Sequence, residues 1–195
     1  VNFDEAVKDR AAVEKAMIVR TPTPIEGAWF WTSPTQALFR PKDYWPGNIP
    51  IELDVDLRGV KAGPGLWGQD NTRTVYQTTD SVVMKADAQD LMMDVIINGK
   101  KQRTIPVTMG MPGFETMSGT KLIMTKERTR VMDNATAGVS EDDPDHYRVK
   151  VDYAMRLTWH GEFLHASPWA ASAWGNSRIS HGCTSMSLDN AAWLF

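Results

Sequence analysis

The residues of this sequence that can carry covalent chemistry are gathered near its end. Three of the four histidines, His160, His165 and His181, lie between residues 160 and 181, and the single cysteine is Cys183. A lone cysteine is most often an inert buried residue, so its neighbours must decide its role. A thiol with an imidazole in reach can act as an activated nucleophile. The clustering therefore favours nucleophilic catalysis by Cys183.

The residues on either side of Cys183 support this hypothesis. Gly182 permits an unusual backbone angle and the close approach of a substrate. A helix is expected soon after the cysteine, which would place backbone N–H groups and a positive dipole end near the sulfur. Such an environment lowers a thiol pKa, so we expect Cys183 to react with an alkylating agent faster than a free thiol. The same N–H groups are candidate oxyanion donors.

His165 is the best candidate for the general base. It ends the apolar segment 162–165, and Pro168 forces a turn soon after it. His181 lies two positions before Cys183, so both side chains would share one face of an extended segment. His181 is a base, a substrate holder or a structural support, and the spacing does not choose among these. His160 is expected to be structural and His146 a solvated surface residue.

Metal binding is the competing chemistry. His165, His181 and Cys183, with His160 or Glu162 as a fourth ligand, would make a zinc site. However, His-x-Cys is not a usual zinc spacing, and no second Cys or His pair completes the site. The sequence contains neither a glycine-rich phosphate loop nor a Gly-x-Ser-x-Gly motif.

The elements that must position these residues read as mainly β. In the first half, residues 51–57 alternate apolar and polar, segments 28–31 and 72–77 are further candidate strands, and residues 61–65 form a turn. A helix is expected over 9–17 with Asp9 as its N-cap. This pattern fits a small immunoglobulin-like β-sandwich.

The second half is also mainly β. Residues 91–97 alternate ahead of Asn98-Gly99, a hairpin signal, and residues 100–109 would return. Residues 147–159 alternate over a long stretch, which predicts a strand with one buried face. Residues 188–195 read as a helix with Ser187 as N-cap.

Composition places a boundary and excludes some functions. Seven of the eleven prolines precede residue 78 and ten of the eleven methionines follow it, so we predict domains at 1–78 and 79–195. The net charge of −3 argues against nucleic-acid binding, and no apolar run reaches the roughly 18 residues of a membrane span. The first residues do not form a signal peptide, and the end falls inside a helix, so we expect a fragment or a processed form that lacks a C-terminal part.

The segment Ser180-His181-Gly182-Cys183, with His165 upstream after a spacer of fourteen residues, resembles the signature of the L,D-transpeptidases of bacterial cell walls. Further matches are similar to the mycobacterial branch and its preceding immunoglobulin-like domain. They are Ile25–Trp29, Arg40–Lys42, Tyr44–Pro46, Gly68–Asn71, Met132-Asp133, Gly138-Val139, Pro144–Tyr147 and His165–Trp169.

The resemblance implies a catalytic β-sandwich with a short helix after the nucleophile, and a covalent mechanism that needs no cofactor. Cys183 would attack the carbonyl before the terminal D-Ala of a tetrapeptide stem, and an amine of a second stem would resolve the thioester into a 3→3 cross-link. His165 would manage the protons, and the backbone carbonyl of Ala166 would orient it. N–H groups of Gly182 and Cys183 would bind the oxyanion.

The resemblance also implies the pocket and the partners. Residues that match substrate-binding positions are Tyr147, Met132, Trp169, Ser180 and Ser185. Peptidoglycan stems would be the substrate and carbapenems covalent inhibitors, in an extracytoplasmic compartment, with any membrane anchor in a segment outside this chain.

Three positions depart from the family pattern. Ala166 stands where the family often has Ser, Ser185 where it usually has Asn, and Ala137 where a lid aromatic is expected. These changes predict a more open pocket. They keep two alternatives in view, an L,D-carboxypeptidase that transfers the acyl group to water and a weakly active peptidoglycan-binding homologue.

Overall fold

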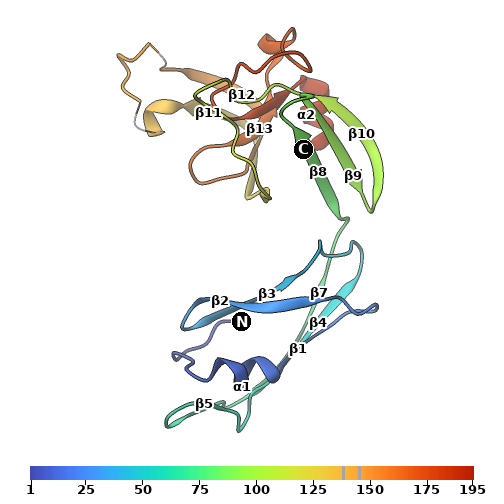
Figure 1. Ribbon diagram of the computed structural model, residues 1–195, viewed down its shortest axis with the longest axis vertical. Helices are drawn as coiled ribbons and strands as arrows, with labels where there is room; N and C mark the ends of the chain where they lie inside the picture. The colour runs from blue at the N-terminus through green and yellow to red at the C-terminus, as the bar shows by residue number, and fades with distance from the viewer. Residues whose placement is uncertain (138, 145) are drawn as a thin grey trace. The chain divides into compact units, whose positions relative to one another are not determined.

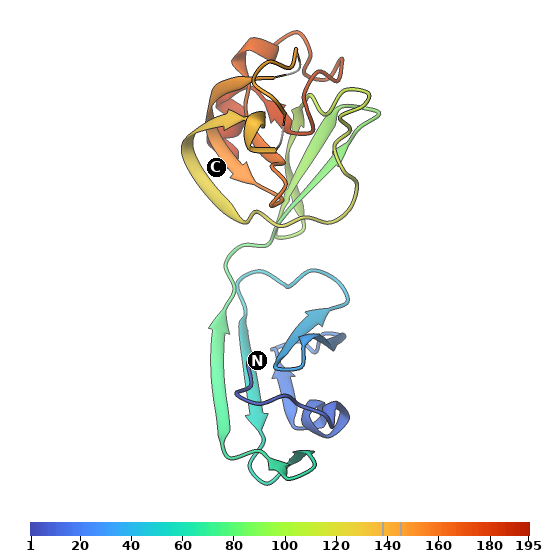
Figure 2. The same ribbon diagram turned by 90° about the vertical axis from the view of Figure 1, so that its left-hand side faces the viewer.

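The computed structural model describes residues 1–137, 139–144 and 146–195, except for the side chain of Ala137. The predicted loss of a lid aromatic at Ala137 and Gly138 therefore falls outside the described residues. The chain divides into two units, Val1–Val82 with Ile97–Lys100, and Val83–Ile96 with Lys101–Phe195. Figure 1 and Figure 2 show the elements of each. The boundary at 78/79 stays a prediction.

The first unit is built mainly of short strands. Its elements are α1 (Arg10–Lys15), β1 (Met17–Arg20), β2 (Gly27–Ser33), β3 (Gln36–Pro41), β4 (Pro50–Asp56), β5 (Lys61–Gly63), β6 (Leu66–Trp67) and β7 (Asn71–Gln77). The segment that alternates most regularly became β4, the central strand of the sheet β1-β4-β7. Asp9 caps α1 as predicted, because its carboxylate accepts a hydrogen bond of 3.1 Å from Ala12 N–H.

The core of this unit joins its two main sheets. Buried residues from α1 and the segment before it, and from β1, β3, β4 and β5, pack with half-buried Trp29 and Trp31 of the β2–β3 hairpin. They are Val7, Val13, Met17, Ala37, Val55 and Ala62. This arrangement confirms the predicted β-sandwich. The prediction of a turn over 61–65 was wrong in extent, because residues 61–63 already pair with β6 and only Pro64 and Gly65 turn.

The second unit holds two sheets and the C-terminal helix. Its elements are β8 (Val82–Asp87), β9 (Met92–Ile97), β10 (Lys100–Pro106), β11 (Thr125–Asp133), η1 (Asn134–Ala137), β12 (Arg148–Arg156), β13 (Phe163–Ala166), η2 (Pro168–Ala170), β14 (Thr184–Met186) and α2 (Leu188–Leu194). The end residues Val82, Ile97 and Lys100 of β8, β9 and β10 fall within the first unit. The sheets are β10-β9-β8 and β11-β12-β13-β14. The hairpin at Asn98-Gly99 is confirmed, since both residues have positive φ (49° and 77°).

The long alternating segment forms β12, with one irregularity. Tyr153 has a φ of 55°, and the pairing with β11 passes from Asp152 to Ala154 without it. Before the irregularity Val151 is buried between more exposed neighbours, whereas after it Ala154 and Met155 are both buried. The predicted strand is confirmed over Arg148–Arg156, but it ends before residues 157–159, and its strict alternation does not hold past Tyr153.

The last two strands bring the predicted chemical residues side by side. β13 and β14 pair in parallel, with Leu164 opposite Thr184 and His165 opposite Ser185. Cys183 lies directly before β14, two positions before Ser185, so its side chain has the same parity as that of Ser185. Neighbouring strands lie about 4.8 Å apart, so this pairing places Cys183 close to His165.

Candidate active site

A pocket of about 250 Å³ in the second unit is lined by residues of the paired strands β13 and β14 and of the segments beside them. Its lining includes every predicted site residue that contributes a side chain, namely Met132, Tyr147, His165, Trp169, Ser180, His181, Cys183 and Ser185. Sequence reasoning missed the rest of the wall, Thr108, Val149, Ser167, Ala170 and Ile179. The position of Ser167 next to the His165 segment was a signal for it, whereas Thr108 lies in an apolar stretch and gave none.

Cys183 is buried at the base of this pocket. It is 7% exposed and packs with Met132, Val151, Ala154 and Phe163. Its thiol donates to the carbonyl of Gly161 at 3.7 Å, and among the described residues no hydrogen bond joins it to His165. Burial raises the pKa of the Cys183 thiol from 9.0 to about 11, and the nearby Glu162 carboxylate adds to the rise.

The expected depression of the Cys183 pKa was therefore wrong for this geometry. The predicted helix is present, and Ser187 caps it by accepting from Asn190 N–H at 3.2 Å. However, the strand β14 separates it from the cysteine, and a helix dipole acts mainly within its first turn. We now expect Cys183 to react with an alkylating agent more slowly than a free thiol near neutral pH, because the thiolate fraction is smaller.

His165 lies on β13 and is 6% exposed. Its Nδ1 is 2.8 Å from the carbonyl oxygen of Ala166, which confirms the predicted contact. A carbonyl can only accept, so Nδ1 carries the proton and Nε2 keeps its lone pair. Desolvation lowers the pKa of His165 below 6.5. The imidazole is therefore neutral near pH 7, as a general base must be. The ring of Trp169 stacks on it, with centroids 6.4 Å apart.

The other histidines occupy three different environments. His181 lines the pocket between the rings of Phe114 and Tyr147, whose centroids lie 4.7 Å and 4.9 Å from its own. This packing favours the support role among the three left open. His160 is exposed in a turn. The interpretation of His146 as solvated surface was wrong, because its Nε2 lies 3.2 Å from Asp133 Oδ1 and its side chain is only 21% exposed.

The turn before Cys183 is closed by the hydroxyl of Ser180. Ser180 Oγ accepts from Gly182 N–H at 3.2 Å and donates to the Cys183 carbonyl at 2.6 Å. Gly182 has a φ of 114°, which explains why glycine stands there. Of the two predicted oxyanion donors, Gly182 N–H is thus already bonded, while Cys183 N–H makes no hydrogen bond within the described part of the chain. Ser180 faces both the pocket and this turn.

Ser185 lies in a buried hydroxyl network. Ser167 Oγ donates to Ser185 Oγ at 2.8 Å and accepts from Trp174 Nε1–H at 3.1 Å. Both serines are at most 2% exposed. The shorter side chain at position 185 thus has a partner of its own, so this part of the wall is not simply open.

The donor set for the competing zinc hypothesis is not assembled. Across residues 1–137, 139–144 and 146–195, no group of three or more His, Cys, Asp or Glu side chains is arranged to hold a metal ion.

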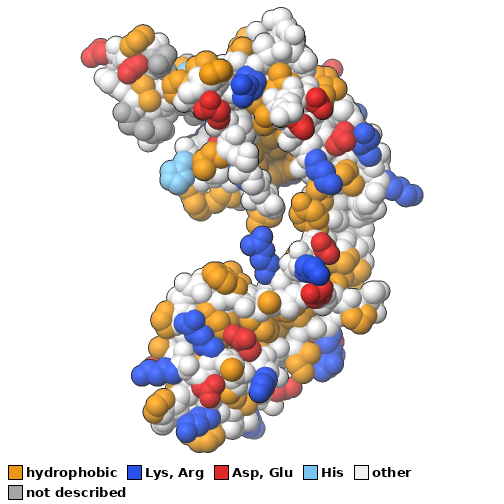
Figure 3. Space-filling model, viewed as in Figure 1, with side chains coloured by type: hydrophobic (Ala, Val, Ile, Leu, Met, Phe, Trp, Pro, Cys, Tyr) orange, Lys and Arg blue, Asp and Glu red, His pale blue; other side chains and the backbone are white. Residues whose placement is uncertain are grey.

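Surface charge is evenly mixed, since Figure 3 shows basic and acidic side chains interspersed on the visible face of both units.

A neutral imidazole oriented by a carbonyl, next to a cysteine in a small pocket, defines a cysteine acyl-transfer site. Comparison with known proteins gives the family. Residues 1–61 match a family described as a bacterial Ig domain, and residues 81–195 match one described as an L,D-transpeptidase catalytic domain.

Curated relatives agree along the whole chain. L,D-transpeptidase 2 of Mycobacterium tuberculosis (strain CDC 1551 / Oshkosh) is 33% identical over 195 residues, which are 100% of this chain and 48% of that protein. L,D-transpeptidase 1 of strain ATCC 25618 / H37Rv is also 33% identical, over 100% of this chain and 72% of that protein. The chain thus spans about half the length of the first relative and nearly three quarters of the second.

Solved structures share the fold. An LD transpeptidase in complex with imipenem matches with a TM-score of 0.77 at 33% identity, over 99% of this chain and 83% of that one. An L,D-transpeptidase from Mycobacterium smegmatis matches with a TM-score of 0.77 at 32% identity, over 99% and 82%. This chain therefore belongs to the L,D-transpeptidase family.

Enzymes of this family act on the cell wall, which is consistent with an extracytoplasmic location. Among the described residues, no helix combines the length and the apolar character needed to cross a membrane.

Proposed function

We propose that this protein is a peptidoglycan L,D-transpeptidase that forms 3→3 cross-links through an acyl-enzyme on Cys183. The observation that carries the proposal is the hydrogen bond of 2.8 Å between His165 Nδ1 and the Ala166 carbonyl, on the strand that pairs with the Cys183 segment. This bond leaves Nε2 as the only base position of the ring and fixes its direction.

The first half-reaction forms a thioester. Cys183 Sγ attacks the carbonyl carbon between the third residue and the terminal D-Ala, while the thiol proton passes to His165 Nε2. Because the thiol pKa is raised and the imidazole pKa is lowered, a preformed thiolate–imidazolium pair is unfavourable, so proton transfer accompanies the attack. Cys183 N–H stabilises the oxyanion. Collapse breaks the C–N bond, and D-Ala leaves with the proton from His165.

The second half-reaction forms the cross-link. The side-chain amine at the third position of another stem attacks the thioester carbonyl and gives its proton to His165. The C–S bond breaks, the proton returns to the sulfur, and an amide joins the two stems. Met132, Tyr147 and Trp169 would hold the stems against the pocket wall. Ser180 and His181 would support the turn 180–183, which we call the nucleophile turn because it ends at Cys183.

The inhibitors and the cellular context follow from the same site. A relative has been solved with imipenem and another with a faropenem-derived adduct. We propose that such β-lactams acylate Cys183 here too. We also propose that the boundary between the two domains lies at 78/79 and that the first domain acts as a spacer. A segment outside these residues would attach the protein to the membrane.

The test is mass spectrometry of the protein incubated with a purified tetrapeptide-stem muropeptide, with Cys183→Ala alongside. A cross-linked dimer and free D-Ala, both absent with the variant, are expected. Tripeptide without dimer would replace the proposal with an L,D-carboxypeptidase. Product that persists with Cys183→Ala, or none with the unaltered protein, would overturn it.

A further inference from the structure

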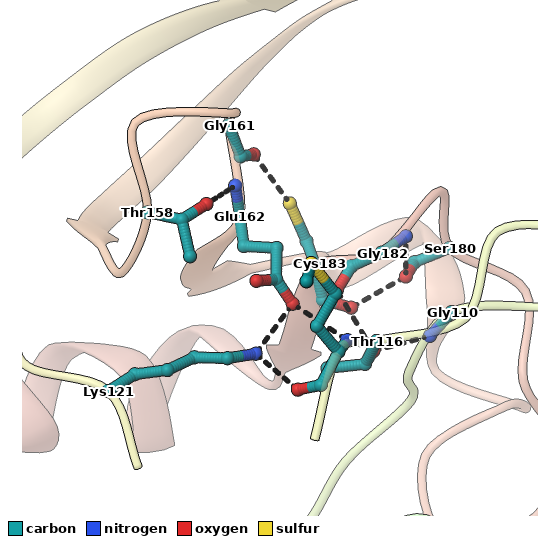
Figure 4. A network of polar contacts seen from close by, with 10 residues as sticks. Gly110, Thr116, Lys121, Thr158, Gly161, Glu162, Ser180, Gly182 and Cys183 are labelled. Carbon is teal, nitrogen blue, oxygen red and sulfur yellow. Dashed lines mark hydrogen bonds and ion pairs between the residues drawn. The ribbon is translucent and has the colours of Figure 1, made fainter. Parts of the chain in front are cut away.

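The loop 110–121 holds the nucleophile turn from outside the pocket. Thr116 Oγ1 accepts from Gly110 N–H at 2.9 Å and donates to the Gly182 carbonyl at 2.9 Å. Figure 4 shows the hydroxyl between these two backbone groups. Because the Gly110 amide occupies the acceptor side of the hydroxyl, its proton is directed to Gly182. No residue of this loop is among those that line the pocket.

The Gly182 carbonyl belongs to the same peptide group as the Cys183 N–H. A peptide group is planar, and in its trans form the C=O and N–H bonds point in opposite directions. A contact that fixes the carbonyl therefore also fixes the N–H. Thr116 draws the carbonyl toward the loop, so the N–H of Cys183 is aimed away from the loop. Cys183 is one of the residues that line the pocket.

The loop itself is anchored beside the nucleophile by a charged contact. Lys121 Nζ donates to Glu162 Oε1 at 2.7 Å and to the Met117 carbonyl at 2.5 Å, and Met117 N–H donates to Glu162 Oε1 at 3.1 Å. Glu162 follows Gly161, whose carbonyl accepts the Cys183 thiol proton. One network thus fixes both the loop and the turn that holds the sulfur (Figure 4).

Gly110 allows the loop to close on itself at this point. A Cβ at position 110 would lie 2.0 Å from the Phe114 carbonyl oxygen and 2.5 Å from Thr116 N, both backbone atoms. Only glycine permits this approach, which brings Thr116 back over Gly110. The placement of the Thr116 hydroxyl is therefore built into the backbone of the loop.

We propose that Thr116 is a positioning residue that aims the Cys183 N–H at the oxyanion. This inference rests on the proposed function, because an oxyanion forms only when Cys183 attacks a carbonyl. Thr116 itself touches neither the pocket nor the reacting atoms. It acts through the Gly182–Cys183 peptide group, in which the Cys183 N–H is the donor left unbonded within the described residues.

The experiment compares two reactions of the same thiol. Acylation by imipenem, followed as an adduct by mass spectrometry, passes through an oxyanion, whereas alkylation by iodoacetamide does not. Thr116→Val removes the hydroxyl and keeps the shape. We expect it to slow acylation at least about tenfold and to change alkylation by less than about threefold, since loss of a whole oxyanion donor costs about 10²–10³. Thr116→Ser, which keeps the hydroxyl, should acylate at close to the original rate.

Thr120→Val, on an exposed part of the same loop, is the matched control and should leave both rates unchanged. Equal acylation rates for Thr116→Val and the unaltered protein would overturn the proposal, as would an equal fall in both reactions, which would indicate a general disturbance of the site. Failure of Thr116→Ser to restore acylation would also overturn it. Because no peptide substrate is used, a failure of cross-linking would contradict the proposed function separately.

Discussion

The hydroxyl of Ser167, directly after β13, donates a hydrogen bond of 2.8 Å to the hydroxyl of Ser185 on the neighbouring strand β14. His165 precedes Ser167 by two residues, and Cys183 precedes Ser185 by two. The bond therefore ties the two strands that present the base and the nucleophile. Trp174 completes it by donating its indole N–H to Ser167.

Removing one member of this pair should destabilise the second unit. Ser185→Ala leaves the Ser167 hydroxyl proton buried without an acceptor, which costs about 1–3 kcal/mol of unfolding free energy. Urea denaturation measures the loss, and Ser172→Ala, at an exposed position, should change stability by less than about 0.5 kcal/mol. The double variant with Ser167→Ala should cost less than the sum of the single changes. Additive costs would show that the two hydroxyls are not coupled.

The buried ion pair behind the nucleophile offers a second prediction. Lys121 and Glu162 have side chains only 17% and 11% exposed, and the buried Glu162 Oε2 has no hydrogen-bond partner within the described residues. Lys121→Met leaves that carboxylate uncompensated and should cost about 3 kcal/mol.

The chain supplies a control for this change in an exposed ion pair of the same type. Lys42 and Glu26 lie 2.8 Å apart with side chains 64% and 74% exposed. Lys42→Met should cost less than about 1 kcal/mol, because a solvated pair contributes little. The measurement is the shift of the urea midpoint, and similar shifts for the two variants would contradict the role of burial.

Most residues of the site could be predicted from the sequence, because the signals for them lie within short segments of the chain. The motif around Cys183, the strand end at His165 and the cap at Ser187 each depend on a few neighbouring residues. The pKa of Cys183 depends instead on what packs around the sulfur, and Glu162 and Met132 reach it only through tertiary structure. For the same reason Thr116 was not predicted, since 66 residues separate it from the Gly182 carbonyl it binds.

The raised pKa of Cys183 predicts a loss of stability at high pH. The folded state keeps the thiol neutral up to about pH 11, whereas the unfolded thiol ionises near 9.0. The contribution of the neutral buried thiol to the free energy of unfolding is fully present below pH 9.0. As the pH rises toward 11, the free energy of unfolding falls by up to roughly 2–3 kcal/mol.

Cys183→Ala isolates this effect from the other groups that titrate in the same range. Urea denaturation at about pH 7 and at about pH 10.5 should show a larger loss for the unaltered protein than for the variant. Identical losses would mean that the thiol ionises in the folded state as easily as in the unfolded chain.

The lowered pKa of His165 predicts how the rate of Cys183 acylation falls at acid pH. A base whose folded pKa is depressed stays unprotonated as the pH falls through 6.5, so the imipenem acylation rate should decline with a midpoint below that value. The rate is measured between about pH 5 and pH 8. Trp169→Ala removes the ring that stacks on His165 and admits water, so it should move the midpoint upward toward 6.5. Trp67→Ala, in the first unit, should leave the profile in place. A midpoint at or above 6.5 in the unaltered protein would show that His165 is more hydrated than its 6% exposure indicates.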